Sequence, residues 1–462
     1  MENQSRRDFL KNAAVVTAGF TAGVADSNIF AAPASGSVLG ANDKIRMGFI
    51  GVGNRGSELL GYFMQHPDCE VAALCDIYDP YLQRDRNKVN QRWIDMLGSK
   101  IPQLGEQFPT KPKLFSDFRK LLEDKSIDAV CIATPDHWHA IQTIEAIRAE
   151  KDVYCEKPLS ITLLEGRKMI QAQAASKQVV AVGINRRGNI AYQNLIKEVH
   201  GGKLGQIIRG RGVYASNLFP KGIGKMKPED PPKDFNWDIW LGPRAHRPYQ
   251  YNIAPYFFRW WNDYSSQLGN WGVHHMDAMR WLMGETAPLY ISAHGGKYVL
   301  DHDATINDTD VVTFEFASKK IMTYEILEST SEGGLFPYGE LEIRGTQGMA
   351  FVNEAGYRIR PASAGQFQNW SRPFEEIVFD NQIRPVGGSS GMVRNFLDCV
   401  KSRNTPLCPL EEGHRSTSMA HLANIALIVK ERLQWDPVNE RFINNKKAND
   451  LLSYEYRKPW KL

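Results

Sequence analysis

The chain has 462 residues, of which 42% are hydrophobic and 23% are charged. These fractions are close to those of an ordinary globular protein, with ample material for a core and, by length, about two to three domains. The formal net charge of +4 is small for this length and gives no basic stripe, so we exclude nucleic acid as a partner.

The N-terminal residues have the pattern of a twin-arginine export signal. The segment SRRDFLK at 5–11 carries the paired arginines, a mildly apolar segment follows at 13–24, and APA at 32–34 is similar to a cleavage site. The apolar segment is too short and too rich in Ala and Gly to cross a bilayer as a mature helix, so we expect no stable membrane insertion. We predict a signal peptide at 1–36 and a periplasmic protein that is exported already folded. The alternative is a tail that contains the arginine pair by chance.

The stretch from Lys44 to Asp76 has the order of elements expected of a dinucleotide site. An apolar run at 45–50 passes into the glycine pattern GVGNRG at 51–56 and then into a helical segment. A second apolar run at 71–75 ends on Asp76, about 20 residues after the last glycine. Strand, glycines, helix, strand and acid in this order are far more specific than a lone glycine motif.

Each glycine has a separate task in such a site. Gly51 permits the tight turn, Gly53 lets a pyrophosphate approach the backbone, and Gly56 lets the helix and the strand pack closely. The helix N-terminus then presents N–H groups to the phosphates. We assign Asn54 and Arg55, which lie between the last two glycines, to the same cofactor site.

Asp76 bears on the choice of dinucleotide. Its carboxylate is placed to accept hydrogen bonds from the adenosine ribose hydroxyls and to repel a 2′-phosphate. We therefore predict NAD rather than NADP as the cofactor. The alternative is a structural turn that is followed by a surface Asp.

Strands and helices alternate as far as residue 183. After a linker to about residue 43, we expect further strands at 127–133, 153–155 and 179–183, helices at 57–64, 115–122, 138–149 and 162–175, and a charged insertion at 81–112 that opens with a helix at 81–97. This alternation predicts a doubly wound parallel sheet. Cys75, Cys131 and Cys155 fall on its strands as small hydrophobic residues. We predict neither a disulfide framework nor a metal site.

From about residue 204 the pattern changes, and from 289 onward the predicted strands follow one another without helices between them. We expect strands at 206–214, 289–293, 310–316, 321–328, 339–343, 349–352 and 357–360, a helix at 273–283, and two closing helices at 392–402 and 415–433. These strands indicate an antiparallel sheet.

Two groups of polar residues follow strands of the first domain. Thr134, Pro135 and His139 lie where one strand ends, near the expected position of the nicotinamide. Glu156 and Lys157 follow the next strand, where an ammonium would stabilise a developing alkoxide and relay a proton if burial lowers its pKa. The alternative is a lysine that forms a salt bridge in a turn.

A third group lies at 257–277. His274 and Asp277 are three residues apart at a helix start and so share one face, and a neutral imidazole near pH 7 is a natural base for a sugar hydroxyl. Trp260, Trp261 and Tyr264 are candidates for stacking on a pyranose, although at this spacing one or two of the three rings are expected to belong to the core. The further candidates for substrate binding are Asn185, Arg186 and Asn270.

These motifs together resemble those of the Gfo/Idh/MocA oxidoreductase family. The segments that carry the resemblance are the glycine fingerprint, ATPDHWHA at 133–140, Glu156-Lys157-Pro158 and GNWGVHHMDAMRWLMG at 269–284. The resemblance covers nearly the whole chain from about Lys44. It implies a Rossmann domain and a C-terminal α+β domain with a large open, mainly antiparallel sheet. It also implies Lys157 and His274 as the catalytic residues.

The resemblance also implies how the domains are used. The inner face of the second sheet would hold a sugar, cyclitol or related polyol, and its outer face would form a homodimer or homotetramer. We place the Rossmann dinucleotide-binding domain at 37–183, the substrate-binding and oligomerisation domain at 184–400, and C-terminal helices and a tail that pack back on both domains at 401–462.

One residue departs from the family pattern D-x-G-x-H. Asn270 stands where the Asp is expected, four residues before His274. An amide cannot polarise or deprotonate the imidazole as a carboxylate does, so Asn270 is expected to bind a substrate hydroxyl instead. His274 then acts as acid or base together with Lys157.

These observations leave three hypotheses. The first is an exported NAD-dependent sugar or glycoside dehydrogenase, in which the hydride goes to the nicotinamide and the proton to His274. By resemblance to exported relatives, the 3-hydroxyl is the expected position of oxidation. The second is a redox-assisted glycoside hydrolase with no net redox change. The third is a non-catalytic sugar-binding protein, which Lys157 and His274 argue against. Because an exported enzyme lacks a supply of free dinucleotide, we expect the NAD to stay tightly bound.

Overall fold

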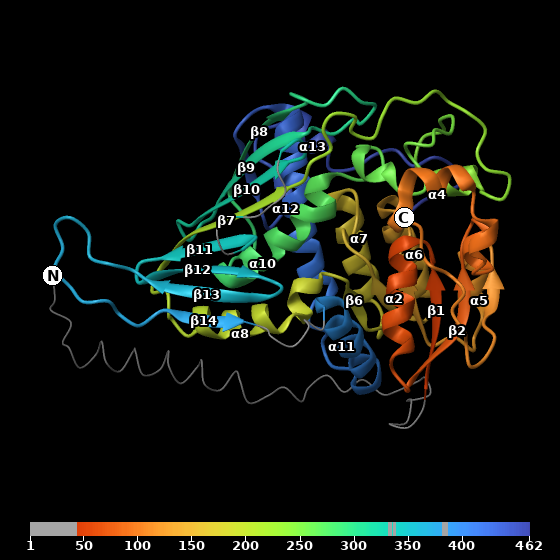
Figure 1. Cartoon of the computed structure of the whole chain (residues 1–462), viewed down its shortest axis with the longest axis horizontal. Coiled ribbons are helices and arrows are strands. Elements are labelled where there is room, and N and C mark those ends of the chain that lie inside the picture. The colour runs from red at the N-terminus through yellow and green to blue at the C-terminus, as the bar shows by residue number, and fades with distance from the viewer. Residues whose placement is uncertain (1–43, 331–334, 336–338, 381–386) are drawn as a thin grey trace, which may run out of the picture. The chain divides into compact units, whose positions relative to one another are not determined.

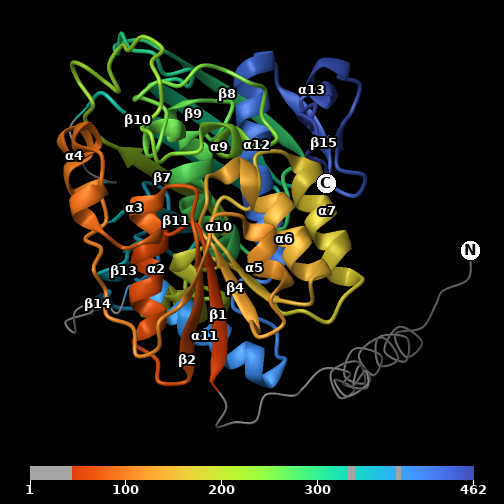
Figure 2. The same ribbon diagram turned by 90° about the vertical axis from the view of Figure 1, so that its right-hand side faces the viewer.

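We describe a computed structural model of the chain over residues 44–330, 335, 339–380 and 387–462. The predicted signal peptide at 1–36 lies outside the described residues. Figures 1 and 2 show the described part from two directions at right angles. No helix in these ranges is both long and apolar enough to cross a membrane.

Six parallel strands form the first sheet, in the order β3-β2-β1-β4-β5-β6. The strands are β1 (Ile45–Ile50), β2 (Cys69–Cys75), β3 (Lys113–Phe115), β4 (Ala129–Ile132), β5 (Asp152–Cys155) and β6 (Val180–Val182). The strand order reverses between β1 and β4, and in such a sheet the carboxyl ends at this point border a crevice for ligands. The predicted doubly wound parallel sheet is confirmed, and Cys75, Cys131 and Cys155 are buried on its strands.

The helices of this domain are α2 (Asn54–Met64), α3 (Asp79–Leu82), α4 (Gln91–Leu97), α5 (Phe118–Glu123), α6 (His139–Arg148) and α7 (Leu163–Ala174). The insertion differs from its prediction, because the helix expected at 81–97 is broken into α3, a 3₁₀ turn and α4. Asp85 accepts a hydrogen bond from the Asn87 N–H, and Asn90 accepts one from the Trp93 N–H. Each side chain therefore caps a new helix start inside the predicted helix.

Ten strands form the second sheet, in the order β14-β13-β12-β11-β7-β10-β9-β8-β15-β16. The strands are β7 (Ile207–Ala215), β8 (Tyr290–Gly296), β9 (Thr309–Glu315), β10 (Ile321–Leu327), β11 (Leu341–Gly345), β12 (Gly348–Asn353), β13 (Gly356–Pro361), β14 (Ile377–Asp380), β15 (Leu433–Asp436) and β16 (Arg441–Phe442). Every described pair is antiparallel except β7 with β10. The predicted mainly antiparallel sheet is confirmed.

Helices cover one face of this sheet, as Figure 1 shows for α10 and α12. The helices of this part are α8 (Ile190–His200), α9 (Trp237–Leu241), α10 (Val273–Met283), α11 (Gly388–Ser402), α12 (Leu410–Val429) and α13 (Lys446–Asp450). A Cβ on Gly210 of β7 would lie 2.6 Å from the sulfur of Met283, so the absence of a side chain at Gly210 lets α10 pack closely against β7. This contact lies at the C-terminal end of α10 and holds that end of the helix against the sheet.

The last predicted helix, at 415–433, is wrong at its end. Lys430 adopts a left-handed conformation with φ of 62° and terminates α12. Leu433 and Trp435 are buried on β15, which pairs with the edge of the second sheet. The alternation of buried and exposed residues from Leu433 onward is therefore that of a strand.

Candidate active site

The glycine turn has the close contacts that its spacing predicts. Gly51 has a φ of +82°, and a Cβ there would lie 2.9 Å from the backbone of Ala133. A Cβ on Gly56 would lie 1.9 Å from the carbonyl oxygen of Gly51, so no larger residue fits between α2 and β1. Helix α2 begins at Asn54 rather than at the predicted Ser57, and no side chain caps its first turn. Its first N–H groups thus remain available to an anion.

Asp76 ties the end of β2 to this turn. Its Oδ2 accepts a hydrogen bond from the Val52 N–H at 2.8 Å, and its Oδ1 accepts one from the Tyr78 N–H at 3.0 Å. Burial raises the pKa of this carboxyl, and the two backbone N–H groups oppose that rise. An ionised carboxylate still has lone pairs free after two such bonds, so Asp76 can accept hydrogen bonds from ribose hydroxyls.

One cavity of about 550 Å³ joins the glycine turn to the second domain. The predicted site residues that line it are Gly51, Gly53, Asn54, Arg55, Asp76, Thr134, Pro135, His139, Glu156, Lys157, Asn185, Arg186, Asn270 and His274. Residues of two domains and of six separate chain segments therefore face a single space. Gly56 lies behind this wall and acts through packing.

Lys157 joins the two domains inside the cavity. Its Nζ donates hydrogen bonds to the main-chain carbonyl of Asn270 at 2.7 Å and to the Oδ1 of Asn270 at 3.1 Å. Burial lowers the pKa of Lys157 to about 8, although the nearby Glu156 and Asp136 oppose that change. The ammonium is thus poised to change its protonation state near neutral pH.

Glu156 is paired with the glycine turn rather than with Lys157. Its Oε1 accepts a hydrogen bond from Nε of Arg55 at 2.9 Å, and its Oε2 accepts one from the backbone N–H of Lys157 at 3.0 Å. Arg55 also donates to the hydroxyl of Ser389. The cofactor turn, the end of β5 and α11 are in this way linked through one guanidinium.

His274 is a buried residue at the start of α10. Burial is the main cause that lowers its pKa well below the usual value, and the charges of Lys157 and Arg186 act in the same direction. The ring is therefore neutral at pH 7. Its Nδ1 is buried without a hydrogen-bond partner in the described part of the chain. Because Asn270 replaces the family's Asp, no carboxylate of that residue orients this ring.

His139 ties two loops of the cavity together. Its Nδ1 lies 2.7 Å from the carbonyl oxygen of Pro158, and its Nε2 lies 2.9 Å from the carbonyl oxygen of Thr134. The loops that follow β4 and β5 are thereby held at a fixed distance. Both ring nitrogens face these carbonyls, so the ring acts within the cavity wall.

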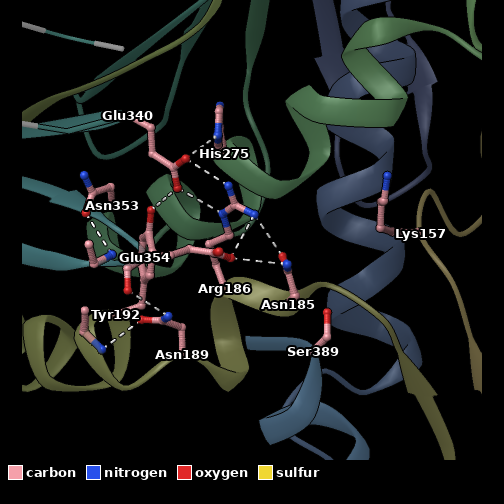
Figure 3. A network of polar contacts seen from close by, with 12 residues as sticks. Lys157, Asn185, Arg186, Asn189, Tyr192, His275, Glu340, Asn353, Glu354 and Ser389 are labelled. Atoms are coloured by element: carbon pink, nitrogen blue, oxygen red, sulfur yellow. Dashed lines mark hydrogen bonds and ion pairs between the residues drawn. The ribbon is translucent and has the colours of Figure 1, made fainter. Parts of the chain in front are cut away.

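Arg186 is the centre of a polar network that Figure 3 shows beside Lys157. Its guanidinium donates from Nε and Nη2 to the two carboxylate oxygens of Glu340, at 3.0 and 2.9 Å, and its Nη1 lies 3.2 Å from Oε1 of Glu354. Asn185 accepts a further bond from Arg186 at 3.0 Å. These carboxylates hold Arg186 and Asn185 against the second sheet, with both residues facing the cavity.

His275 lies on the other side of Glu340. Its Nε2 is 3.2 Å from Oε2 of Glu340, and its Nδ1 is 3.0 Å from the hydroxyl of Tyr324. The guanidinium of Arg186 and the neighbouring His275 hold the pKa of Glu340 well below its usual range against the effect of burial. His275 therefore supports the network, whereas His274 faces the cavity.

Several predicted substrate residues do not line the cavity. Trp260 donates from Nε1 to Oε2 of Glu328 at 2.8 Å, and its ring is buried. Tyr264 is fully buried, with its ring packed edge-on against Trp240 at 4.8 Å. Both belong to the core, which was the alternative left open for these aromatic residues.

Asp277 also points away from the cavity, although it shares a helical face with His274. Its two carboxylate oxygens accept hydrogen bonds from Arg187 at 2.9 Å, and Oδ1 accepts one from the hydroxyl of Ser416 at 2.6 Å. This buried ion pair joins α10 to α12 and to the turn after β6. The expectation that Asp277 binds substrate is corrected by this geometry.

Sequence reasoning missed several residues that line the cavity. Asp136 is buried and accepts a hydrogen bond from the Ser265 hydroxyl, and burial raises its pKa. Arg259 stacks on Tyr256, with its Cζ 4.2 Å from the ring centroid. Asp136 lies within the ATPDHWHA segment, and Arg259 lies beside two tryptophans. Their neighbours along the chain therefore offered a signal for both residues.

Two further residues act from distant parts of the chain. Arg84 of the insertion donates from Nη1 to the carbonyl oxygen of Val52 at 2.7 Å and so braces the glycine turn from behind. Trp460 lines the cavity and packs edge-on against Trp138 at 4.7 Å. Neither position has a sequence pattern that marks it for this site.

A backbone bridge closes the edge of the cavity near Asp76. Tyr78 forms an isolated antiparallel bridge with Phe235 of the second domain. The Asn236 N–H donates to the carbonyl oxygen of Ile77, and the Asp79 N–H donates to that of Asp234, both at 3.2 Å. The loop at 234–236 therefore covers the end of β2, where an adenosine would lie.

Two family profiles match most of the chain. Residues 45–184 match an oxidoreductase family with an NAD-binding Rossmann fold, named GFO_IDH_MocA. Residues 184–325 and 374–462 match the C-terminal alpha/beta domain of the same oxidoreductase family. The two matches meet at residue 184, where the first sheet has ended and the second domain begins.

Curated relatives match over part of the chain. An alpha-N-acetylgalactosaminidase of Shewanella oneidensis is 30% identical over 235 residues, and a glycosyl hydrolase family 109 protein of Shewanella baltica is equally similar. Each alignment covers 47% of this chain and 47% of the relative. The chain thus spans about half the length of the curated relatives that it matches.

Solved structures share the fold over a longer range. An aldose-aldose oxidoreductase of Caulobacter crescentus, complexed with glycerol, aligns with a TM-score of 0.60 at 17% identity. The WlbA dehydrogenase of Bordetella pertussis, in complex with NADH and UDP-GlcNAcA, aligns with a TM-score of 0.60 at 19% identity. Both alignments cover 85% of this chain and 99% of the other. The matches to both domains of the family show that the chain belongs to the Gfo/Idh/MocA oxidoreductase family.

Proposed function

We propose that the protein is an NAD-dependent oxidoreductase that oxidises a ring hydroxyl of a sugar or glycoside. The observation that carries the proposal is the cavity, in which Lys157 and His274 share one space with the glycine turn and Asp76. A polar substrate and a dinucleotide would both border on this space. The solved structures named above support a carbohydrate substrate, since one is that of an aldose-aldose oxidoreductase and the other is in complex with a nucleotide sugar.

The residues of the first domain fit NAD. The uncapped first turn of α2 and the glycine turn would hold the pyrophosphate, and Asp76 would accept hydrogen bonds from the ribose. The carboxylate of Asp76 disfavours a 2′-phosphate, which supports NAD over NADP. When bound, NAD supplies the acceptor for the hydride of the substrate carbinol.

The substrate proton is handled by this chain's own residues. The neutral imidazole of His274 accepts the proton of the substrate hydroxyl. The ammonium of Lys157 stabilises the negative charge that develops on the same oxygen. His274 is buried and Lys157 is partly buried, so their interactions with the substrate would be screened less than at the protein surface.

The relatives from Shewanella favour a second candidate function. One of them is named an alpha-N-acetylgalactosaminidase and the others are named family 109 glycosyl hydrolases. A redox-assisted hydrolase begins with the same oxidation of a ring hydroxyl, so Lys157 and His274 would act in the same way. The ring carbonyl would acidify the neighbouring C–H bond, so that loss of this proton expels the aglycone by elimination. Addition of water and reduction of the carbonyl back to the hydroxyl would then release the sugar with no net redox change.

We further propose that the protein is exported folded to the periplasm with its NAD tightly bound. The twin-arginine pattern at 5–11 and the apolar segment at 13–24 support export. The bridge between Tyr78 and Phe235 supports retention, because it must open before a nucleotide can leave the adenosine edge. A purified protein that holds no dinucleotide, and that turns over only with free NAD, would contradict this proposal.

We also propose a homodimer or homotetramer that forms through the outer face of the second sheet. Val311 of β9 and Ile321 of β10 are 42% and 43% exposed on strands whose alternate residues are buried. Apolar side chains on an uncovered sheet face support a contact between copies. Sedimentation analysis of the wild type and of a Val311→Lys/Ile321→Lys variant tests it, since the variant should dissociate.

Product analysis separates the two catalytic functions. The purified protein is incubated with aryl glycosides, with and without an added electron acceptor. A keto-glycoside that accumulates with the acceptor supports the dehydrogenase. Release of an intact reducing sugar without accumulation of NADH supports the hydrolase. Absence of both products across α- and β-linked glycosides and free aldoses would contradict the proposed function.

A further inference from the structure

A chain of hydrogen bonds leads from Lys157 to a buried carboxylate in the second domain. The Oδ1 of Asn270 accepts from Lys157 at 3.1 Å, and its Nδ2 donates to Oε1 of Gln267 at 3.0 Å. Gln267 in turn donates from Nε2 to Oε1 of Glu328. Glu328 follows β10, and Gln267 precedes the turn that carries Asn270. Two amides therefore connect the ammonium to a carboxylate.

Only one orientation of the two amides satisfies this chain. Lys157 is a donor without an acceptor, so Asn270 must turn its oxygen toward it. The Asn270 NH₂ then faces Gln267, which must present its oxygen in return. The Gln267 NH₂ is left for Glu328, whose carboxylate only accepts once it is ionised. The carboxylate at one end thus fixes the direction of every dipole up to the ammonium at the other end.

Glu328 is otherwise a costly residue to bury. Glu328 is only 1% exposed. Besides Gln267, the side chain that donates to its carboxylate is Trp260, through Nε1–H at 2.8 Å. No cation forms an ion pair with it among the residues that the structure describes. A carboxylate that is buried without a cation usually destabilises the fold, which favours a functional reason for its presence.

The residue that accepts the hydrogen bond from Lys157 is not the aspartate that the family pattern has at this position. Asn270 occupies the place of the family's Asp, so the side chain that accepts the hydrogen bond from Lys157 carries no negative charge of its own. We propose that Glu328 is a positioning residue, which orients Asn270 through Gln267 and so stabilises the ammonium of Lys157. The inference concerns how Lys157 is held, and it rests on the proposed function only for its effect on catalysis.

Other charges face both ends of this chain. Asp308 and Asp310 act on Glu328 from β9 and the segment before it, and burial with these two charges raises the pKa of Glu328 to about 7. The charged or titratable groups that face Lys157 are Glu156, Asp136, Arg259, Arg55 and His274. The experiment therefore has to separate transmission through the amides from a direct effect of charge.

The test measures the pKa of Lys157 directly. The protein is produced with ¹³C-labelled lysine, the Cε resonance of Lys157 is assigned from a Lys157→Arg variant, and its shift is followed with pH. In Glu328→Gln, which keeps the shape of the side chain, the pKa of Lys157 should fall by about one pH unit because the amide dipoles are no longer aligned. Gln267→Met leaves the carboxylate in place but breaks the chain, and it should cause a similar fall.

A matched control removes a nearby charge that is outside the chain. Asp310→Asn takes away a carboxylate that faces Glu328 but makes no bond to Gln267, so the pKa of Lys157 should stay within the error of the wild-type value. The double variant Glu328→Gln/Gln267→Met should shift the pKa no further than either single variant. The proposal would be overturned if the pKa of Lys157 were unchanged in Glu328→Gln, or if it shifted equally in Asp310→Asn.

The catalytic readout is kept separate from the titration. If the proposed function holds, the pH profile of kcat should move in Glu328→Gln in the same direction as the measured pKa of Lys157. A purely structural role of Glu328 would lower the unfolding temperature and leave both quantities where they are. Because the titration needs no turnover, a protein that fails to oxidise glycosides would contradict the proposed function without affecting this inference.

Discussion

Nζ of Lys157 donates a hydrogen bond to the main-chain carbonyl of Asn270 at 2.7 Å, across the junction of the two domains. Lys157 follows β5 of the parallel sheet, and Asn270 lies in the turn that leads into α10. The bond therefore fixes the distance between the cofactor side and the substrate side of the cavity. It also places the start of α10, and with it His274, at a set distance from the ammonium.

We expect Lys157→Met and His274→Ala each to lower kcat by about 10²- to 10³-fold, because each removes a group that acts on the reacting oxygen. Turnover of the glycoside identified by product analysis is the measurement. Lys168→Met removes an exposed lysine of α7 and should leave kcat unchanged. Either active-site variant with wild-type turnover would contradict its proposed role.

The pH dependence of oxidation should contain a limb that belongs to Lys157. Burial lowers its pKa to about 8, so the ammonium is present below this pH and is lost as the pH rises through it. The rate of oxidation is therefore expected to fall above about pH 8. In Lys157→Arg the guanidinium stays charged to far higher pH, so any residual activity should lack this limb. A limb that persists in the Arg variant would belong to another group.

Asp76→Asn should weaken the preference for NAD over NADP. The amide keeps one oxygen as an acceptor but removes the negative charge that opposes a 2′-phosphate. Mass analysis of the dinucleotide that copurifies with each protein is the measurement, with the wild type as the reference. The expected result is a rise in the bound fraction of NADP. An unchanged ratio would show that another group selects the cofactor.

Two glycines of α2 form a matched pair for stability. Gly56→Ala places a Cβ 1.9 Å from the carbonyl oxygen of Gly51 and should destabilise the protein by several kcal/mol. Gly61→Ala lies on the same helix where a Cβ meets no atom within 4 Å, and it should stabilise by about 0.5–1 kcal/mol. Thermal unfolding of the two variants measures both effects. Similar unfolding temperatures would argue against the close packing of α2 on β1.

Asp277→Asn tests the corrected role of that residue. It leaves the buried guanidinium of Arg187 without its main carboxylate, and breaking a buried pair costs about 3–5 kcal/mol. We expect a lower unfolding temperature and a kcat per folded molecule close to that of the wild type. A large fall in kcat at unchanged stability would restore Asp277 to the substrate site.

The sequence predicted the elements whose patterns are local. The glycine fingerprint and Asp76 place the cofactor side, and α10 spans the predicted residues 273–283 because Gly284, with φ of 67°, ends it. Strands β3, β14, β15 and β16 were not predicted, since they have two to four residues and lack a recognisable pattern of their own. Their pairing depends on neighbours that are remote in the chain.

The site residues that belong to local motifs were predicted. Those that reach the site only through tertiary contacts were missed. The spacing correctly placed His274 and Asp277 on one helical face. His274 lines the cavity, however, whereas Asp277 is paired with Arg187 outside it. Glu328 and Trp460 approach the site from remote segments, and nothing in their neighbours along the chain marks them. The periodicity of a helix identifies a face but not the segment that will pack against it.

The bridge between Tyr78 and Phe235 has a consequence for the kinetics of the protein. Any nucleotide covered by this edge exchanges only after a local opening, so its release rate is bounded by the opening rate rather than by its affinity. The amide proton of Asn236, which is bonded to Ile77, would report the same opening through its exchange with deuterium. If the protein holds one tightly bound nucleotide, as proposed, a donor substrate and an acceptor substrate would react with it in turn, and double-reciprocal rate plots for the two would be parallel.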